Sequence, residues 1–366
     1  MTESQTWHNM DLLGACWMVR SLEQAVSSVS FDQQNNLVAG GWDGQMRKWN
    51  SDGDLLWSEN LPDRISEIVF HQDQIIATSG LHIVALNAEN GQINWQHPLE
   101  GSADSAIVVN DEIYVTSSVY DIEHNDFLES AIWKYSLQGK QKWIIRMNER
   151  PWFILTHKSK VMVGLGRPMS GWGEILPKGK IINHQLETSS PIMCGTKNSK
   201  EVLFGHADGT ISSTKSIENK FAESVELLQA TDNLRIISLE GGTLITTDKS
   251  NQEIWSAKGS PISTQAVGFI SGKNNTHWTT RWSGIEGNLE VRNLVDGNLI
   301  AQAPMPQTSA IFSNDSRVVI GSDDGKIHVW EKDMFSRRNQ SNDVEQTESS
   351  TQRDALKEKL RALRNK

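Results

Sequence analysis

This 366-residue sequence has very little cysteine and no long apolar run. Its two cysteines, Cys16 and Cys194, are far apart and match no C-x-x-C pattern, which argues against a disulfide framework and a cysteine-held metal cluster. No stretch approaches the roughly 18 consecutive apolar residues that a membrane span needs. The N-terminal segment starts acidic and lacks the apolar core of a signal peptide. We therefore expect a cytoplasmic protein.

Motifs that define common active sites are also missing. Neither G-x-S-x-G nor G-x-x-x-x-G-K-[ST] occurs, so the hydrolase elbow and the phosphate-binding loop lack their defining residues. Residues 118–130 (SVYDIEHNDFLES) gather several possible metal ligands, but their spacing matches neither an EF-hand loop nor H-E-x-x-H. We interpret this stretch as a solvated acidic loop. The sequence predicts no catalytic, cofactor-binding or metal-binding residue, and it leaves open an active site assembled from residues far apart in the chain.

Charge is distributed unevenly along the chain, whose net charge is −10. Residues 336–366 contain 8 Lys or Arg and 5 Asp or Glu, so residues 1–335 carry the balance of −13. An acidic body of this kind argues against a binding surface for nucleic acid.

Tryptophan, by contrast, is abundant, with 14 residues against 3 tyrosines, and hairpin signals recur. Segments such as GGWDGQMRKW (40–49) and GSDDGKIHVW (321–330) each contain an apolar strand end, a tight D-G turn and an alternating strand. The spacing of these turns averages about 40 residues, which is typical of one four-stranded blade per repeat. The turn glycines are Gly44, Gly209, Gly242, Gly287 and Gly325.

A second landmark follows many of these hairpins, a strand that ends in Trp57, Trp95, Trp143 or Trp255. We expect these indoles to fill the space between neighbouring blades. Eight repeats fit the sequence, with seven as the alternative. The last repeat lacks its outer strand, and residues 14–23 (GACWMVRSLE) supply a matching strand, so we predict that the N-terminus closes the ring. The predicted repeat starts are Val26, Ile65, Asp104, Trp152, Pro191, Leu228, Ile262 and Thr308.

The repeats resemble two related families. ALNAENGQINW (85–95) resembles the repeat of quinoprotein-type β-propellers, and GSDDGKIHVWEKD (321–333) resembles a WD40 blade. The resemblance covers residues 14–335 and implies an all-β, single-domain β-propeller. Quinoprotein dehydrogenases are typically exported, bind calcium with their cofactor, and in many cases place adjacent cysteines against the quinone. Because this chain lacks an export signal and a cysteine pair, we predict that it binds no quinone and no other cofactor.

Four tryptophans fall outside the outer-strand series, in loops that a propeller places on one face. Together with three arginines they predict a partner-binding rim, which rests on the frequency of Trp and Arg at interface hot spots. Arg167 and Trp172 belong to the widest insertion and are expected to matter most. The alternative is that each Trp fills its own loop. The predicted rim comprises Trp42, Arg150, Trp152, Arg167, Trp172, Arg281 and Trp282.

The C-terminal tail divides in two. Residues 336–350 are polar and predict a disordered linker. Residues 351–366 predict an amphipathic helix with an apolar stripe of Leu356, Leu360 and Leu363, which needs a partner or the propeller itself to bury it. Contact with nucleic acid or a membrane through the basic residues of this tail is a weaker alternative, because Asp354 and Glu358 dilute their charge.

These observations predict a non-enzymatic scaffold that binds other proteins through one loop face and the helical tail. The alternative is an enzyme or small-ligand binder that uses the central channel. A cluster of ionisable residues with shifted pKa values in a channel pocket would favour that alternative.

Overall fold

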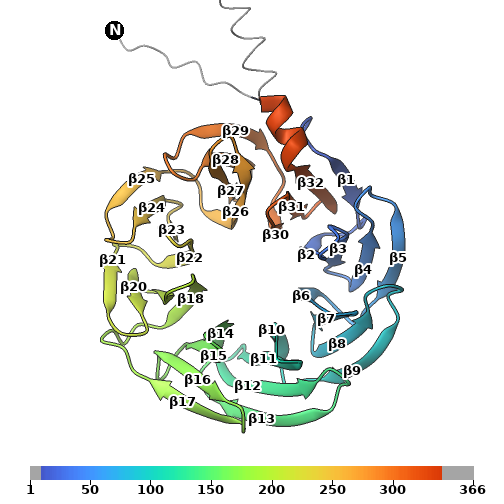
Figure 1. Cartoon of the computed structure of the whole chain (residues 1–366). Helices are drawn as coiled ribbons and strands as arrows, with labels where there is room; N and C mark the ends of the chain where they lie inside the picture. Colours follow the sequence, from blue (N-terminus) through green and yellow to red (C-terminus); the bar gives the residue numbers. More distant parts are fainter. Residues whose placement is uncertain (1–9, 340–366) are drawn as a thin grey trace, which may run out of the picture.

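A computed structural model describes residues 10–339 and contains eight four-stranded antiparallel sheets arranged as blades around a central channel (Figure 1). Within a blade we name the strands A to D from the channel outward. Blade 1 is β2 (Val26–Phe31), β3 (Leu37–Gly41), β4 (Gln45–Trp49) and β5 (Leu55–Asn60); blade 2 is β6 (Ile65–His71), β7 (Gln74–Ser79), β8 (His82–Asn87) and β9 (Ile93–Pro98). Blade 3 is β10 (Ser102–Val109), β11 (Glu112–Asp121), β12 (Asp126–Ser136) and β13 (Gln141–Met147); blade 4 is β14 (Pro151–His157), β15 (Lys160–Leu165), β16 (Trp172–Leu176) and β17 (Lys180–His184).

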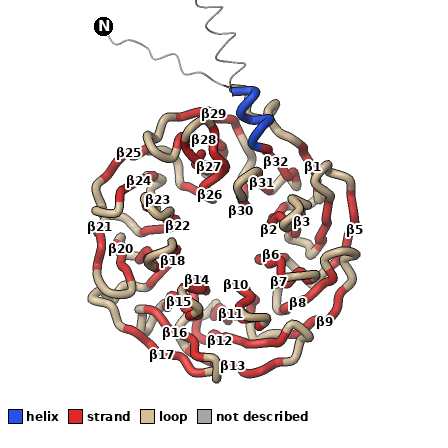
Figure 2. The backbone as a smooth tube through the Cα atoms, in the orientation of Figure 1, coloured by secondary structure: helices blue, strands red, loops and turns tan. Residues whose placement is uncertain are grey.

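The other half of the ring repeats the same plan, as the backbone trace in Figure 2 shows. Blade 5 is β18 (Ile192–Lys197), β19 (Val202–His206), β20 (Thr210–Ser213) and β21 (Ile217–Lys220); blade 6 is β22 (Val225–Ala230), β23 (Leu234–Leu239), β24 (Leu244–Asp248) and β25 (Glu253–Ala257). Blade 7 is β26 (Ile262–Ser271), β27 (Asn274–Trp282), β28 (Gly287–Asn293) and β29 (Leu299–Pro304); blade 8 is β30 (Thr308–Ser313), β31 (Arg317–Ser322), β32 (Lys326–Glu331) and β1 (Met18–Ser21).

The ring is closed by its N-terminal strand, as the sequence predicts. β1 pairs antiparallel with β32, with Met18 opposite Val329, and the backbone N–H of Trp17 donates to the Val329 carbonyl at 2.7 Å. The eight-blade prediction is confirmed, and the seven-blade alternative is wrong. Each A strand begins within three residues of the predicted repeat start, because the apolar A strands and their glycine turns mark the repeat clearly.

The outer-strand tryptophans of blades 1, 2, 3 and 6 each contact the following blade. The indole Nε1 of Trp95 donates to the Leu137 carbonyl of blade 3 at 2.8 Å, and that of Trp255 donates to the Leu294 carbonyl within blade 7 at 3.0 Å. Each ring covers a glycine in the neighbouring C–D turn: a Cβ built on Gly297 would lie 2.5 Å from the Trp255 ring. That glycine also has a φ of +72°, so the turn requires glycine for both reasons.

A helix at residues 332–339, not predicted from the sequence, follows β32 and packs on blades 7 and 8 (Figure 1). Phe335 is buried against Phe269 and Trp278, with ring centroids 5.4 and 5.5 Å away. The first residues of the predicted linker 336–350 are therefore helical. The rest of that linker and the predicted helix at 351–366, with Leu356, Leu360 and Leu363, lie outside the described residues. Within residues 10–339 no helix is long and apolar enough to cross a membrane.

Candidate functional site

The strand order places two sets of loops at the same end of every blade. The loops that join strands B and C, and the links from one blade to the next, form what we call the B–C face; the A–B and C–D loops form the opposite face. All seven residues of the predicted rim lie at the B–C end of their blades. The B–C loops are residues 42–44, 80–81, 122–125, 166–171, 207–209, 240–243, 283–286 and 323–325.

Apolar side chains are exposed at the tips of five B–C loops. Ile122 and Ile285 are each 86% exposed, more than any other large hydrophobic residue of the described chain. Trp42, Leu81 and Met169 are also exposed, in the loops of blades 1, 2 and 4. A set of exposed apolar side chains on one face of a protein favours its use as an interaction surface.

Trp42 of the predicted rim is held in place by an arginine from the next link. The Arg64 guanidinium carbon lies 3.7 Å from the centroid of the Trp42 ring, which is a cation–π arrangement. Burial lowers the pKa of Arg64 from its ordinary value. Trp42 keeps 46% of its surface exposed, so it presents an oriented indole face to solvent.

Arg150 and Trp152 form a cluster with two residues that the sequence did not indicate, Phe127 and Asp104. The Arg150 guanidinium lies 3.7 Å from the Phe127 ring centroid and 4.1 Å from that of Trp152, and it pairs with Asp104 at 3.2 Å. Burial raises the pKa of the Asp104 carboxyl, while a hydrogen bond from Ser118 and the charge of Arg150 oppose the rise. The cluster lies where β10 and β14 begin, at the B–C end of the channel.

Asp104 and Trp152 occupy equivalent positions because every A strand has a bulge near its start. The register shifts between Ala103 and Ser105 in β10 and between Pro151 and Phe153 in β14, and the other six A strands shift at the same place. A bulge re-aims the side chain of its extra residue. The bulge therefore places one residue of each blade, equivalent to Asp104 and Trp152, near the B–C end of the channel.

The stretch 118–130 is not the solvated loop that the sequence predicted. β11 and β12 continue as a hairpin through Tyr120 and Phe127, whose rings meet edge to face at 5.1 Å, and only 122–125 form the turn. Strand alternation was hidden by the acidic residues on its outward side. Asp121 accepts hydrogen bonds from the backbone N–H groups of Glu123 and His124, and the described residues hold no group of three or more metal-ligating side chains.

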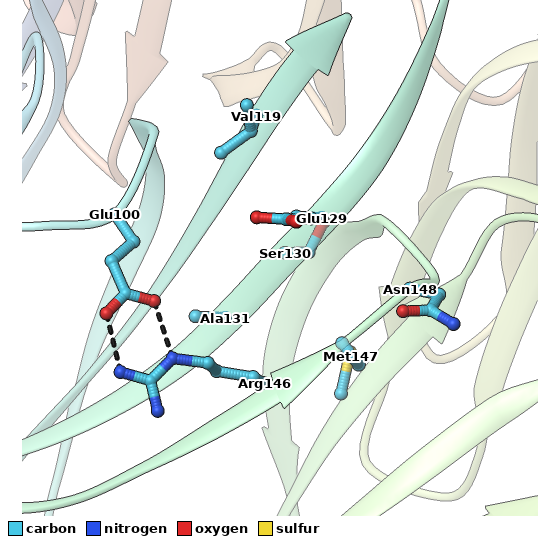
Figure 3. A pocket seen from close by; sticks show the side chains of 8 residues that line it. All are labelled: Glu100, Val119, Glu129, Ser130, Ala131, Arg146, Met147 and Asn148. Atoms are coloured by element: carbon cyan, nitrogen blue, oxygen red, sulfur yellow. Dashed lines mark hydrogen bonds and ion pairs between the residues drawn. The ribbon is translucent and has the colours of Figure 1, made fainter.

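A pocket of about 260 Å³ lies beside this hairpin (Figure 3). Arg146 donates two hydrogen bonds to Glu100, at 2.7 and 2.5 Å, along one wall of the pocket. This pair holds the pKa of Glu100 below its ordinary value and raises that of Arg146. Glu129 also lines the pocket, from the B–C end of β12.

Two members of the predicted rim are buried and pack within the ring. Trp172 is 7% exposed and stacks on His184 at 3.9 Å between ring centroids, in an apolar cluster with Phe204. Arg281 is 3% exposed and donates to the carbonyls of Gly242 and Ser260 at 2.7 and 2.8 Å. The expectation that Trp172 is a prominent surface contact is wrong, because β16 begins at Trp172 and turns its ring inward.

The remaining two members are accessible. Arg167 is exposed in the B–C loop of blade 4. Trp282 is partly exposed and lines an open groove of about 790 Å³ between blades 7 and 8, with Ile285, Met305 and two prolines. The structure thus brings Arg150, Trp152 and Phe127 into direct contact, whereas Trp42 and Trp282 lie on other blades.

The B–C face is strongly acidic. Its loops and links carry thirteen acidic and four basic residues, whereas the loops of the opposite face carry ten acidic and seven basic ones. The acidic residues of the B–C face are Glu23, Asp43, Asp63, Glu100, Glu123, Glu149, Glu187, Asp208, Glu223, Glu240, Glu286, Asp323 and Asp324, and the basic ones are Arg64, Arg150, Arg167 and Lys258.

The channel contains a cavity of about 340 Å³, lined by six serine or threonine residues and six apolar residues from blades 1, 2, 6, 7 and 8. Glu67 is the one ionisable residue among the described residues that line it. Burial in the channel raises the pKa of Glu67 to about 7, opposed by a hydrogen bond from Ser105. Burial also raises the pKa of both free thiols, Cys16 and Cys194, to about 12, which leaves them protonated and poorly nucleophilic.

Sequence comparisons match two family models. The model described as outer membrane protein assembly factor BamB matches residues 4–118 and 43–166, and the model described as WD domain, G-beta repeat, matches residues 304–331. No curated protein sequence matches the chain.

Solved structures match most of the chain. The computationally designed Ika8 protein is 18% identical, with a TM-score of 0.68, over 85% of this chain and 98% of its own. BamB from Moraxella catarrhalis is 15% identical, with a TM-score of 0.68, over 86% of this chain and 96% of its own. Sqt1 from Saccharomyces cerevisiae is 10% identical, with a TM-score of 0.69, over 86% of this chain and 97% of its own. At these identities the likeness concerns the fold, and with the matched family models it identifies the chain as an eight-bladed β-propeller repeat protein with repeats of the quinoprotein-like and WD40-like kinds.

Proposed function

We propose that this chain is a non-enzymatic scaffold that binds another protein through its B–C face. The observation that carries the proposal is the exposure of apolar tips from five different blades on that one face. Loop tips contribute little to blade packing, so their apolar side chains are free for intermolecular contact. Arg150, Trp152 and Trp42 add oriented aromatic and guanidinium groups of the type found at hot spots.

The acidic character of the face adds a preference among partners. Four of the thirteen carboxylates pair with basic side chains of the adjoining strands, and the other nine still outnumber the four basic groups of the loops and links. The resulting negative potential speeds the approach of a basic protein surface and repels an acidic one. The partner that fits best therefore has apolar side chains flanked by lysine or arginine.

One observation favours a second candidate, a small polar ligand in the channel. Glu67 is a carboxyl with a pKa raised to about 7 in a cavity lined by both hydroxyl-bearing and apolar residues. A single carboxyl without a second acid, base or nucleophile is a weak basis for catalysis. We rank this candidate below the scaffold.

We further propose a cytoplasmic location, because Cys16 and Cys194 are free thiols, as is usual in compartments that keep thiols reduced. Because the larger family match is to an outer membrane assembly factor, an exported location is the alternative. Fractionation of cells that express the chain separates the two, and recovery outside the cytoplasm would contradict the proposal.

The test of the scaffold is affinity purification of the wild-type chain and of matched variants, followed by mass spectrometry. Ile122→Asp and Leu81→Asp replace exposed tips of the B–C face, and Val295→Asp replaces a 45% exposed residue of an opposite C–D loop as the control. We expect the B–C variants to lose a shared set of partners that the control retains. Retention of every partner by both B–C variants would contradict the proposal.

A further inference from the structure

The groove between blades 7 and 8 combines apolar walls with unneutralised charge. Trp282 and the 86% exposed Ile285 come from the end of β27 and the following loop, while Met305 and its flanking prolines come from the link into blade 8. The groove has a volume of about 790 Å³ and is open to the B–C face. Apolar exposure of this extent in a concave site favours an occupant with apolar side chains.

Two carboxylates line the same groove. Glu286 and Asp323 are exposed, and neither forms a salt bridge with another residue in the described range 10–339. Asp323 accepts a hydrogen bond from the Ser309 hydroxyl at 2.9 Å, which fixes its position without neutralising its charge. A segment that carries both apolar side chains and positive charge would therefore fit this groove.

The chain itself contains such a segment beyond the described residues. Residues 351–366 include six lysines or arginines and two acidic residues, so they carry a net charge of about +4. Their leucines, at 356, 360 and 363, recur with helical spacing, which would place them on one side of a helix.

The length of chain between the two regions permits contact. The described chain ends at residue 339, in the helix that packs on blades 7 and 8 through Phe335 (Figure 1). Residues 340–350 could span about 36 to 40 Å if fully extended. A six-residue strand such as β29 is about 20 Å long, which approximates the distance between the two faces of a blade. Residues 340–350 are therefore long enough to reach from one face to the other.

We propose that residues 351–366 dock in the groove between blades 7 and 8 of the same chain. The leucines contact Trp282 and Ile285, and the basic side chains lie near Glu286 and Asp323. The docked segment covers one sector of the B–C face and leaves the Arg150 cluster and Trp42 free. This contact requires no partner protein, so it stands or falls separately from the scaffold function.

The first test is carbodiimide coupling of the full chain at low concentration, which joins lysine amines to carboxylates in direct contact. Peptide mapping of the monomer is expected to show Lys357 or Lys359 joined to Glu286 or Asp323. The matched background is coupling of the same lysines to Glu89 and Asp296, which lie in C–D loops of the opposite face. Coupling no greater than this background, or found only between two chains, would overturn the proposal.

The second test measures the contact in trans. A full-length chain with Leu356→Ser, Leu360→Ser and Leu363→Ser frees the groove, and a fluorescent peptide of residues 351–366 reports binding by anisotropy. We expect Glu286→Lys in that chain to weaken binding at least tenfold and Glu89→Lys to leave it within twofold. Equal weakening by the two variants, or no binding to the parent chain, would show that the segment has another target.

Discussion

The two faces of this propeller use their apolar residues differently. On the opposite face, Met10, Leu12 and Phe335 fill the end of blades 7 and 8, and the indoles of the outer strands are covered by C–D turns. Among the A–B and C–D loops of the described chain, Val295 alone is an exposed large hydrophobic residue, whereas five B–C loops expose one. Closing and joining the blades occupies one face and leaves the other with side chains available for contact.

The largest expected effect concerns the strand that closes the ring. Deleting residues 1–24 removes the pairing of β1 with β32 and the hydrogen bond from the Trp330 indole to the Leu12 carbonyl. It also exposes the edge of β32. We expect a loss of several kcal/mol of unfolding free energy and a tendency to aggregate, measured by urea denaturation and light scattering. An unchanged denaturation midpoint would show that the ring does not depend on this strand.

Buried and exposed tryptophans should differ next most strongly in their contribution to stability. Trp255→Ala removes a buried indole and its hydrogen bond to Leu294, with an expected cost of about 3 to 5 kcal/mol. Trp172→Ala should resemble it, because Trp172 is equally buried. Trp42→Ala removes an exposed ring and should cost less than about 1 kcal/mol. Denaturation of the three variants checks the order, and similar losses for Trp42 and Trp255 would erase the distinction.

Two glycines of blade 7 give a finer comparison. Gly297→Ala places a Cβ 2.5 Å from the Trp255 ring at a φ of +72°, whereas Gly284→Ala, at a φ of +94°, has no atom within 4 Å. Both substitutions strain the backbone by about 1 kcal/mol. The contact should raise the cost at Gly297 to about 2 to 3 kcal/mol, as measured by thermal unfolding. Equal costs would mean that the indole does not constrain the turn.

Glu67, in the channel between the two faces, should make the stability of the fold depend on pH. The raised pKa of Glu67, about 7 in the folded chain, means that the fold favours the protonated carboxyl. Its contribution to stability is therefore complete below the unfolded pKa of about 4.3 and is lost as the pH rises through 7. Glu67→Gln should add about 1 to 2 kcal/mol at pH 8 and nothing at pH 4. An equal gain in stability at pH 4 and pH 8 would show that the substitution acts through packing and not through the charge of Glu67.

Much of this architecture could be predicted from the sequence, because turn glycines and outer tryptophans recur with the blade. The same spacing placed Trp172 and Arg281 at the correct end of their blades. It could not show that β16 turns the Trp172 ring inward or that Arg281 binds the carbonyls of Gly242 and Ser260, since side-chain direction depends on where a strand begins.

The exposed isoleucines were missed for a different reason. Ile122 and Ile285 are single apolar residues in polar turns, and each is followed by a glutamate. The predicted rim was based on tryptophan and arginine, so it did not include isoleucine. A lone isoleucine within a four-residue turn has no strand face on which to be buried, and that signal could have identified both. Phe127 was hidden because acidic neighbours masked the strand alternation of 126–130.

The central claim, that the B–C face is the contact surface, is tested most directly by hydrogen–deuterium exchange of the chain alone and in complex with a purified partner. We predict slower exchange in residues 42–44, 80–81 and 119–128 on binding, with exchange in the C–D turns 88–92 and 137–140 unchanged. Protection confined to those C–D turns or to the helix at 332–339 would contradict the claim and move the contact to the opposite face.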